Sequence, residues 1–239
     1  MKGALFVIDC LRSDVFPKWF LDKYSGTFYK RFFVCLMTPA SLSSMLLGRH
    51  LQTTDTPFPY PNCLELFYKR PPGESLFQAL SKKNIKVYCY SDELLVRKGW
   101  WTKEAELLNN FTKLNNPNVF LFWHTYRAHL PVIYHGNLDF LLKKKQEYLK
   151  NVEIAFREIE HIVDTYKFDK FIVMGDHGEE FFEDREGDLD IGHGGYKKWL
   201  ITDNIIFTGC FISGEETKTV EDIISYKFLY NTILRWYGL

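Results

Sequence analysis

Apolar runs and longer amphipathic stretches alternate along the chain. Short runs rich in Val, Ile and Phe predict buried strands at residues 3–9, 85–90, 118–123, 169–174 and 204–212. Longer patterns with a helical period predict helices at residues 39–47, 74–82, 103–114, 138–166 and 220–237. Since strands that alternate with helices connect by right-handed crossovers, the pattern predicts an α/β fold, with a mainly parallel sheet sandwiched by helices.

The longest helical pattern, at residues 138–166, has a single apolar stripe. Its members are Leu141, Tyr148, Leu149, Val152, Phe156, Ile159 and Val163. Because Lys, Glu and Arg fill the other face, we expect this helix to cover one face of the sheet.

The chain has no internal repeat or low-complexity linker, and its 239 residues suit one well-packed domain. We therefore expect residues 1–239 to form a single α/β domain. Residues 53–72 contain five of the nine prolines and predict an irregular loop or flap.

The composition is that of a globular protein, with 46% hydrophobic, 17% aromatic and 25% charged residues. These fractions exclude a disordered or fibrous chain. Five scattered cysteines with no Cys-x-x-Cys pair favour core thiols. The apolar opening at 4–8 is too short for a signal peptide or a membrane span, so we expect a cytoplasmic protein without a membrane anchor.

Charge is distributed unevenly, although 30 acidic residues balance 30 basic ones. Positions 176–190 hold eight carboxylates and one Arg, which leaves 22 acids and 29 bases elsewhere. The basic run at 143–145 lies in the long helical pattern, where a solvated helix face explains it. No nucleic-acid partner is expected, and most of the acidic stretch is expected to form a solvated loop.

Polar side chains follow three of the predicted strands. Asp9 ends the first strand, His124 and then His129 follow the third, and Asp176 and His177 follow the fourth. Each residue alone has an ordinary explanation as a cap, a turn residue or a structural histidine. Because ligands gather at the carboxyl ends of parallel strands, the set predicts a metal site suited to zinc or manganese.

Thr38 precedes Pro39 at the start of a predicted helix. As an N-cap followed by Pro at the first helical position, it needs no further explanation. The same position also suits catalysis, because free N–H groups at a helix N-terminus can hold a phosphate or sulfate while the hydroxyl attacks. A nearby metal would lower the pKa of that hydroxyl.

Taken together, these segments resemble the sulfatase-like branch of the alkaline phosphatase superfamily, which includes phosphodiesterases and phosphoglycerol or phosphoethanolamine transferases. Similar segments occur in the family's order at residues 7–14, 38–48, 74–87, 120–131 and 174–179, the last followed by 192–194. The first reads VIDCLRSD, the second begins with Thr38, and the last contains DHG and later GHG. The resemblance implies an alkaline-phosphatase-like core.

The resemblance also assigns roles to individual residues. It implies that a divalent metal is bound by Asp9, Thr38, Asp176 and His177. It implies that Thr38 is the nucleophile and that His129 and His193 contact the transferred group. Substrate contacts are further expected from Arg127, Ser41 and His124.

Two departures from the family pattern decide the expected chemistry. A sulfatase converts a Cys or Ser to formylglycine, but this chain has Thr38 there and Leu42 where the motif needs Arg. We therefore expect a small-molecule or glycan phosphate mono- or diester as substrate and a phospho-threonine intermediate. A sulfate ester hydrolase and a catalytically degraded metal-binding module are the alternatives.

The second departure is Arg127, which stands where the family's loop has Asp. Its positive charge favours one metal ion over two, because it can take the place of a second ion beside the phosphoryl oxygens. A solvated loop residue explains Arg127 equally well. Zn or Mn is the favoured ion, Ca or Mg is possible, and the sequence does not specify an oligomeric state.

Overall fold

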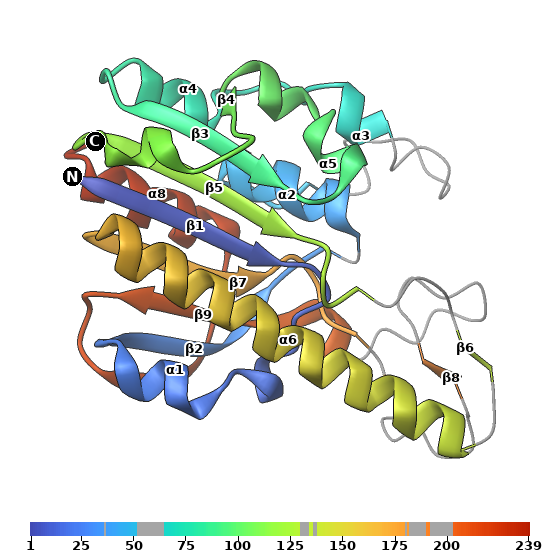
Figure 1. Cartoon of the computed structure of the whole chain (residues 1–239). Helices are drawn as coiled ribbons and strands as arrows, with labels where there is room; N and C mark the ends of the chain where they lie inside the picture. Colours follow the sequence, from blue (N-terminus) through green and yellow to red (C-terminus); the bar gives the residue numbers. More distant parts are fainter. Residues whose placement is uncertain are drawn as a thin grey trace.

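The structure is a computed structural model, and it describes residues 1–35, 37–51, 65–129, 134–135, 138–179, 181, 190–191 and 203–239. Its centre is an eight-stranded sheet with the strand order β10-β2-β9-β7-β1-β5-β3-β4 (Figure 1). These strands are β1 (Lys2–Ile8), β2 (Gly26–Phe33), β3 (Lys86–Ser91), β4 (Glu106–Leu107), β5 (Val119–Thr125), β7 (Lys170–Gly175), β9 (Phe207–Ser213) and β10 (Lys218–Ile224). Two further short strands, β6 (Tyr134–His135) and β8 (Asp190–Ile191), pair with each other.

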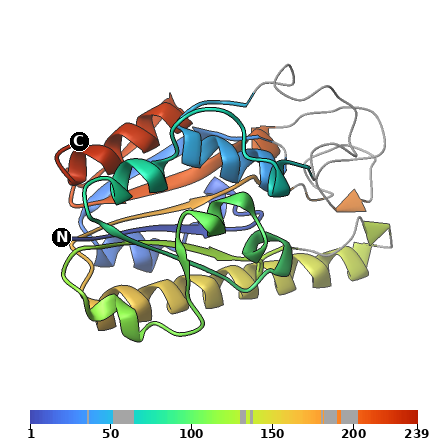
Figure 2. The ribbon, with the colours of Figure 1, turned by 90° about the horizontal axis from the view of Figure 1, so that it is seen from above.

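Helices lie on both faces of this sheet. They are α1 (Lys18–Lys23), α2 (Thr38–Leu47), α3 (Glu65–Tyr68), α4 (Leu76–Ser81), α5 (Leu94–Arg97), α6 (Leu138–Tyr166), α7 (Asp203–Ile206) and α8 (Tyr226–Trp236). Short 3-10 turns occur at Ser13–Val15, Trp100–Lys103 and Thr112–Asn115. Figure 2 shows α6 along one face, with α2 and α8 on the other.

The central strand β1 divides the core into two layers. Ala4, Phe6 and Ile8 pack in the layer that contains α1 and α6, whereas Leu5 and Val7 pack in the layer of α2, α4 and α8. Successive side chains of a strand point to opposite faces, so a strand buried on both faces must be apolar at every position. This requirement explains the unbroken apolar runs in the sequence.

The parallel register of three strands determines where the polar residues meet. Ile8 of β1 lies opposite Gly175 of β7 and also opposite Thr125 of β5. The residues that follow these three positions therefore leave the sheet side by side, at its carboxyl edge. This edge is where ligands bind in parallel α/β sheets.

The α/β class is confirmed, and each of the five predicted strands is present, although residues 204–206 of the fifth belong to α7. The prediction of helices was wrong in two places. Residues 220–237 form β10 followed by α8, because the exposed edge strand needs few apolar positions and its spacing resembles a helix. Residues 103–114 contain β4 and part of two 3-10 turns in place of a helix. Asn109 and Asn110 favour turns over helix interiors there.

Further differences concern the sheet and the long helix. The sequence did not predict β2 or α1, and β9 runs antiparallel to both of its neighbours, β2 and β7. The long helix matches α6, but Leu149 of its predicted stripe is 40% exposed. Residues 53–64 of the predicted flap lie outside the described residues, and α3 forms just after them.

Gly175, the last residue of β7, yields a test of how the carboxyl edge is assembled. A Cβ there would lie 2.3 Å from Thr208 Oγ1 and 2.7 Å from the carbonyl oxygen of Leu11. Because neither atom can move without breaking the hydrogen bonds between Thr208 and both Gly175 and Leu11, Gly175→Ala should lower the free energy of unfolding by about 1–3 kcal/mol. Urea denaturation measures this change.

The control is Gly238→Ala, since a Cβ at Gly238 meets no atom within 4 Å. Gly238→Ala should lower the free energy of unfolding by about 1 kcal/mol at most, because only the left-handed backbone of Gly238 disfavours alanine there. If both variants lost the same free energy of unfolding, close packing around Gly175 would be contradicted.

Candidate active site

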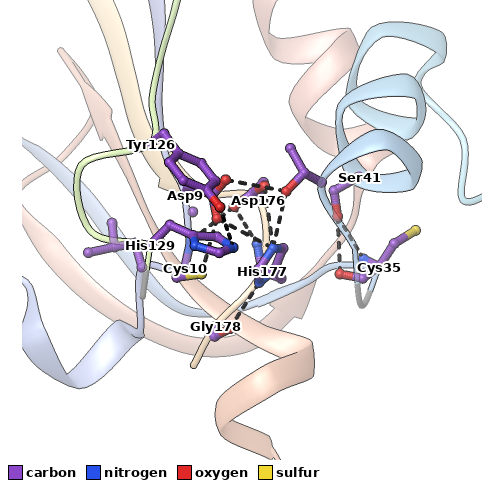
Figure 3. Close-up of polar contacts among 12 residues, drawn as sticks. Asp9, Cys10, Cys35, Ser41, Tyr126, His129, Asp176, His177 and Gly178 are labelled. Atoms are coloured by element: carbon purple, nitrogen blue, oxygen red, sulfur yellow. Dashed lines mark hydrogen bonds and ion pairs between the residues drawn. The ribbon is translucent and has the colours of Figure 1, made fainter. Parts of the chain in front are cut away.

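Four of the residues predicted to act together do lie together at the carboxyl edge. Asp9 directly follows β1, Asp176 and His177 follow β7, and Thr38 is the first residue of α2. Met37, and not Thr38, occupies the N-cap position, so the hydroxyl of Thr38 is not used as a helix cap. Figure 3 shows Asp9, Asp176 and His177 pointing toward one another.

The distances describe a compact polar cluster. Thr38 Oγ1 donates a hydrogen bond to Asp9 Oδ2 at 3.3 Å and lies 3.3 Å from His177 Nε2. The same ring nitrogen lies 3.5 Å from Asp9 Oδ1 and 3.7 Å from Asp176 Oδ2. Asp176 Oδ1 is held by the backbone N–H groups of Cys10 at 3.2 Å and His177 at 2.9 Å.

The ring of His177 is oriented by a backbone carbonyl. Its Nδ1 lies 3.0 Å from the carbonyl oxygen of Gly178. Because a carbonyl oxygen can only accept, this contact places the proton of a neutral ring on Nδ1. The lone pair of Nε2 then faces Thr38 and the carboxylates, in the tautomer that metal-binding histidines use.

Asp9 and Asp176 are both fully buried, and their titrations are coupled. Burial raises the pKa of Asp9 well above its usual value, and the charge of Asp176 raises it further. Burial acts against ionised Asp176 as well, but the charges of His177 and His124 outweigh it, so the pKa of Asp176 falls below its usual value. The opposite pKa shifts mean that the negative charge of the pair is favoured on Asp176 over Asp9.

Two buried polar atoms of this cluster have no hydrogen-bond partner among the described residues: His124 Nε2 and Asp176 Oδ2. His124 Nε2 lies 3.7 Å from Asp9 Oδ2, while Nδ1 of the same ring contacts Ser91 Oγ at 3.1 Å. Asp9, His124 and Asp176 each offer a ligand atom within 4.8 Å of the others. A divalent cation would satisfy these atoms, and mixed carboxylate and imidazole donors fit zinc or manganese.

The cluster opens into a pocket of about 180 Å³. Its lining is Asp9, Met37, Thr38, Pro39, Phe67, Glu93, Leu95, Val96, Tyr126, His129 and His177. His129 stacks on Tyr126 with ring centroids 4.0 Å apart, and its Nε2 lies 3.0 Å from the Tyr126 hydroxyl. Burial and the nearby charge of Asp9 raise the pKa of Tyr126, so its hydroxyl remains protonated and can donate.

His124 and Ser41 lie next to this pocket, not in its lining. His124 is fully buried in β5, against Asp9. The Ser41 hydroxyl accepts from the backbone N–H of Cys35 at 3.1 Å and contacts the Tyr226 hydroxyl at 3.0 Å. Through these two contacts Ser41 connects the backbone before Thr38 to α8. Its side chain supports the fold, whereas the sequence predicted a contact with substrate.

Arg127 is not brought to the cluster. Its guanidinium lies 2.5 Å from Glu158 Oε1 of α6, and it lines a separate pocket of about 560 Å³ with residues of that helix. The expected contact between Arg127 and phosphoryl oxygens therefore finds no support in this geometry. His193 lies outside the described residues.

Most of the acidic stretch also lies outside the described residues, but Glu179 does not. Contrary to the expectation of a solvated side chain, Glu179 is fully buried, and its charge contributes to the raised pKa of Asp9. The basic run at 143–145 lies on α6 and is exposed or half-buried, as predicted.

Two residues of the site were missed in the sequence. Tyr126 lies between two histidines after a strand, and this position was the signal that could have identified it. Cys10, interpreted as a core thiol, is a buried cysteine like Cys35, Cys89 and Cys210. Its Sγ nevertheless donates to Asp9 Oδ1 at 3.0 Å, and burial raises its pKa.

Known structures share this arrangement of strands and helices. The C-terminal periplasmic domain of phosphoethanolamine transferase EptC from Campylobacter jejuni matches with a TM-score of 0.68 and 16% identity, over 99% of this chain and 89% of that one. A 2-O GAG sulfatase matches with a TM-score of 0.73 and 11% identity, over 100% of this chain and 70% of that one. A protein in the alkaline phosphatase superfamily from Vibrio parahaemolyticus matches with a TM-score of 0.65 and 12% identity, over 100% and 66%.

This chain has the sulfatase-like fold of the alkaline phosphatase superfamily. No family model matches the sequence, and no curated protein matches it. The sulfatase-like fold is thus visible in the structure and in a few short motifs, while identity over the whole chain is low.

The comparison corrects the expected cytoplasmic location. The matched EptC domains from C. jejuni and Escherichia coli are both periplasmic, which points away from the cytoplasm. Among the described residues, no helix is both long and apolar enough to cross a membrane.

The opposite pKa shifts of the two carboxylates predict opposite effects of two similar substitutions. The raised pKa of Asp9 costs stability as pH rises above the usual Asp range, so Asp9→Asn should stabilise the metal-free protein at neutral pH. The lowered pKa of Asp176 adds stability above that range, so Asp176→Asn should destabilise it. Each effect should be about 1 kcal/mol in urea denaturation with chelator present.

The Asp9→Asn difference should shrink near pH 4, because a raised pKa costs little stability once the pH has fallen to the usual Asp range. The Asp176→Asn difference should largely remain at pH 4 and decrease only at lower pH, as the lowered pKa of Asp176 is approached. Changes of the same sign at neutral pH would contradict the division of charge between Asp9 and Asp176.

Proposed function

We propose that this protein is a metal-dependent hydrolase or transferase that acts on phosphate mono- or diesters through a phospho-threonine intermediate. The observation that carries this proposal is the position of Thr38. Its hydroxyl lies 3.3 Å from Asp9 Oδ2 and 3.3 Å from His177 Nε2. Thr38 is also the first residue of α2 and lines the pocket.

The proposed divalent ion is held by Asp9, Thr38, Asp176 and His177. When bound, it lowers the pKa of the Thr38 hydroxyl and offsets the negative charge of the substrate. The buried carboxylates and the two unpaired polar atoms support such an ion, and one matched structure is the E. coli EptC domain in complex with zinc. We propose a single ion, with Zn or Mn favoured.

In the first step, the Thr38 hydroxyl would lose its proton to solvent while Oγ1, held beside Asp9 Oδ2, attacks phosphorus. The bond from phosphorus to the leaving oxygen breaks, and the alcohol departs after it takes up a proton from solvent. The stacked pair of Tyr126 and His129 can donate to phosphoryl oxygens from the pocket wall. His193 is proposed to act on the same oxygens, as the family resemblance implies.

The second step releases the phosphoryl group. Water, or the hydroxyl of an acceptor, attacks phosphorus, and the bond between phosphorus and Thr38 Oγ1 breaks. The attacking water or hydroxyl loses a proton to solvent and Thr38 Oγ1 takes one up, so the protons balance and no oxidant or reductant is required. Water gives a hydrolase and an acceptor hydroxyl gives a transferase, such as the phosphoethanolamine transferases among the matched structures.

We propose phosphate esters, and not sulfate esters, as substrates because the nucleophile is Thr38. A sulfatase uses a formylglycine, whereas Thr38 cannot be converted to one. The matched structures include both a phosphoethanolamine transferase and a sulfatase, so their shared fold supports either ester class.

Substitution of Thr38 tests the reaction. Thr38→Ala should reduce turnover of a chromogenic phosphomonoester or phosphodiester at least about 10³-fold, because the variant has no nucleophile. Thr38→Ser is the matched control, since it keeps the hydroxyl and should retain measurable turnover. A phosphorylated peptide containing Thr38, trapped by acid quench and detected by mass spectrometry, should appear only in the wild type and in Thr38→Ser.

Two outcomes would overturn parts of this proposal. Absence of Thr38-dependent turnover with every ester and every metal would reject the enzyme and favour a binding module. Faster turnover of a chromogenic sulfate ester would reject the substrate class.

Metal content tests the proposed single ion. Protein purified without chelator should contain about one equivalent of a divalent metal by elemental analysis. Removal by chelator should abolish turnover, and added Zn or Mn should restore it. About two equivalents per chain would contradict a single ion.

A further inference from the structure

Cys10 has a backbone conformation that its position does not explain. Its φ is 60°, in the left-handed region that non-glycine residues rarely adopt. The other two such residues, Asn84 and Lys167, follow the ends of α4 and α6, where a left-handed residue is common. Cys10 instead follows a central strand. Unusual backbone at such a position suggests that the side chain has a function.

The conformation turns the thiol of Cys10 toward its neighbour. Consecutive residues of an extended strand point to opposite faces. Here Sγ of Cys10 lies 3.0 Å from Asp9 Oδ1, and the Cys10 N–H still donates to Asp176 Oδ1 at 3.2 Å. The backbone of Cys10 thus supports one carboxylate while its side chain faces the other. Figure 3 shows Cys10 beside Asp9 and His177.

Cys10 Sγ, a carboxylate oxygen of Asp9 and a ring nitrogen of His177 all lie within 4.8 Å of one another. In a tetrahedral zinc site with bonds of about 2.0–2.3 Å, ligand atoms are roughly 3.3–3.8 Å apart, so small side-chain shifts suffice. Asp176 Oδ2, fully buried and without a hydrogen-bond partner, lies 3.7 Å from His177 Nε2 and independently indicates a cation there.

We propose that Cys10 binds the metal as a thiolate, together with Asp9 and His177. On binding, the thiol proton passes to solvent, a metal–sulfur bond forms and no redox change occurs. Thr38 Oγ1 and Asp176 Oδ2, which lie 3.3 Å and 3.7 Å from His177 Nε2, remain ligands of the same ion, as in the proposed function.

A thiolate ligand changes which metal the site selects. Soft sulfur ligands favour Zn²⁺ and Co²⁺ over Mn²⁺, Mg²⁺ and Ca²⁺, which prefer oxygen. Cys10 would therefore make this a zinc site. This inference rests on the metal site of the proposed function, but it does not depend on the reaction or on the substrate.

Spectroscopy of the cobalt-loaded protein tests the ligand directly. Chelator-treated wild-type protein titrated with Co²⁺ should develop a sulfur-to-cobalt charge-transfer band in the near ultraviolet. Cys10→Ser should lose that band and keep weaker visible bands from the remaining ligands. Cys35→Ser is the matched control, because Cys35 is also a buried cysteine but is not part of the cluster, so the band of this variant should equal that of the wild type.

Affinity supplies a second readout. In competition with a chromophoric chelator, Cys10→Ser should bind Zn²⁺ at least about tenfold more weakly, while Mn²⁺ binding should change much less. If Cys10→Ser fails to fold, Cys10→Gly replaces it, since glycine adopts the left-handed backbone without strain and also lacks the thiol.

The absence of a charge-transfer band in the wild type, or its persistence in Cys10→Ser, would overturn the proposal. An equal loss of Zn²⁺ and Mn²⁺ affinity would do so too, because it would indicate a general structural effect. These outcomes do not depend on whether the protein turns over any ester. A sulfur-to-cobalt band in a protein without Thr38-dependent turnover would retain Cys10 as a ligand and reject only the reaction.

Discussion

Two buried carboxylates, brought together by the register of two strands, are the constraint on which this site depends. β1 and β7 pair in parallel with Ile8 opposite Gly175, and the chain continues from these strands into Asp9 and Asp176. Both side chains are removed from water, so the two charges repel each other with little screening. A positive charge placed beside Asp9 and Asp176 would therefore stabilise this part of the sheet edge.

Much of the surrounding structure serves to hold this unfavourable arrangement in place. The N–H groups of Cys10 and His177 both donate to Asp176, and the carbonyl of Gly178 orients His177. On the other side, Ser41 and the Tyr226 hydroxyl of α8 hold the backbone of Cys35 just before α2 begins. In the proposed reaction, these contacts would already be formed before substrate binds, so they would need no rearrangement.

The fold is shared with transferases and a sulfatase, so it does not by itself choose the substrate. In this chain the choice rests with the few side chains that line the pocket beside Thr38, among them Tyr126, His129 and Glu93. Arg127 is paired with Glu158 and so leaves the pocket lining without Arg or Lys among the described residues. In the proposed reaction, the ion and the histidines would therefore supply the positive charge beside the phosphoryl group.

The sequence by itself determined the elements with strong local signals. Strands buried on both faces need unbroken apolar runs, and α6 needs a stripe with helical period, so both kinds of element were predictable. The polar residues that end those strands were predictable too, because parallel strands bring their carboxyl ends to one edge. Asp9, Asp176 and His177 were predicted in this way, whereas Thr38 was predicted from its place at the start of a helix and from the family resemblance.

Only the tertiary structure decided the rest, because those features depend on partners distant in sequence. The direction of β9 depends on its pairing with β2 and β7, and the edge strand β10 has too little burial to leave a strand pattern. Arg127 is separated from the site by an ion pair with a helix residue 31 positions away. Cys10 resembled a core thiol until its left-handed backbone showed which way its sulfur faces.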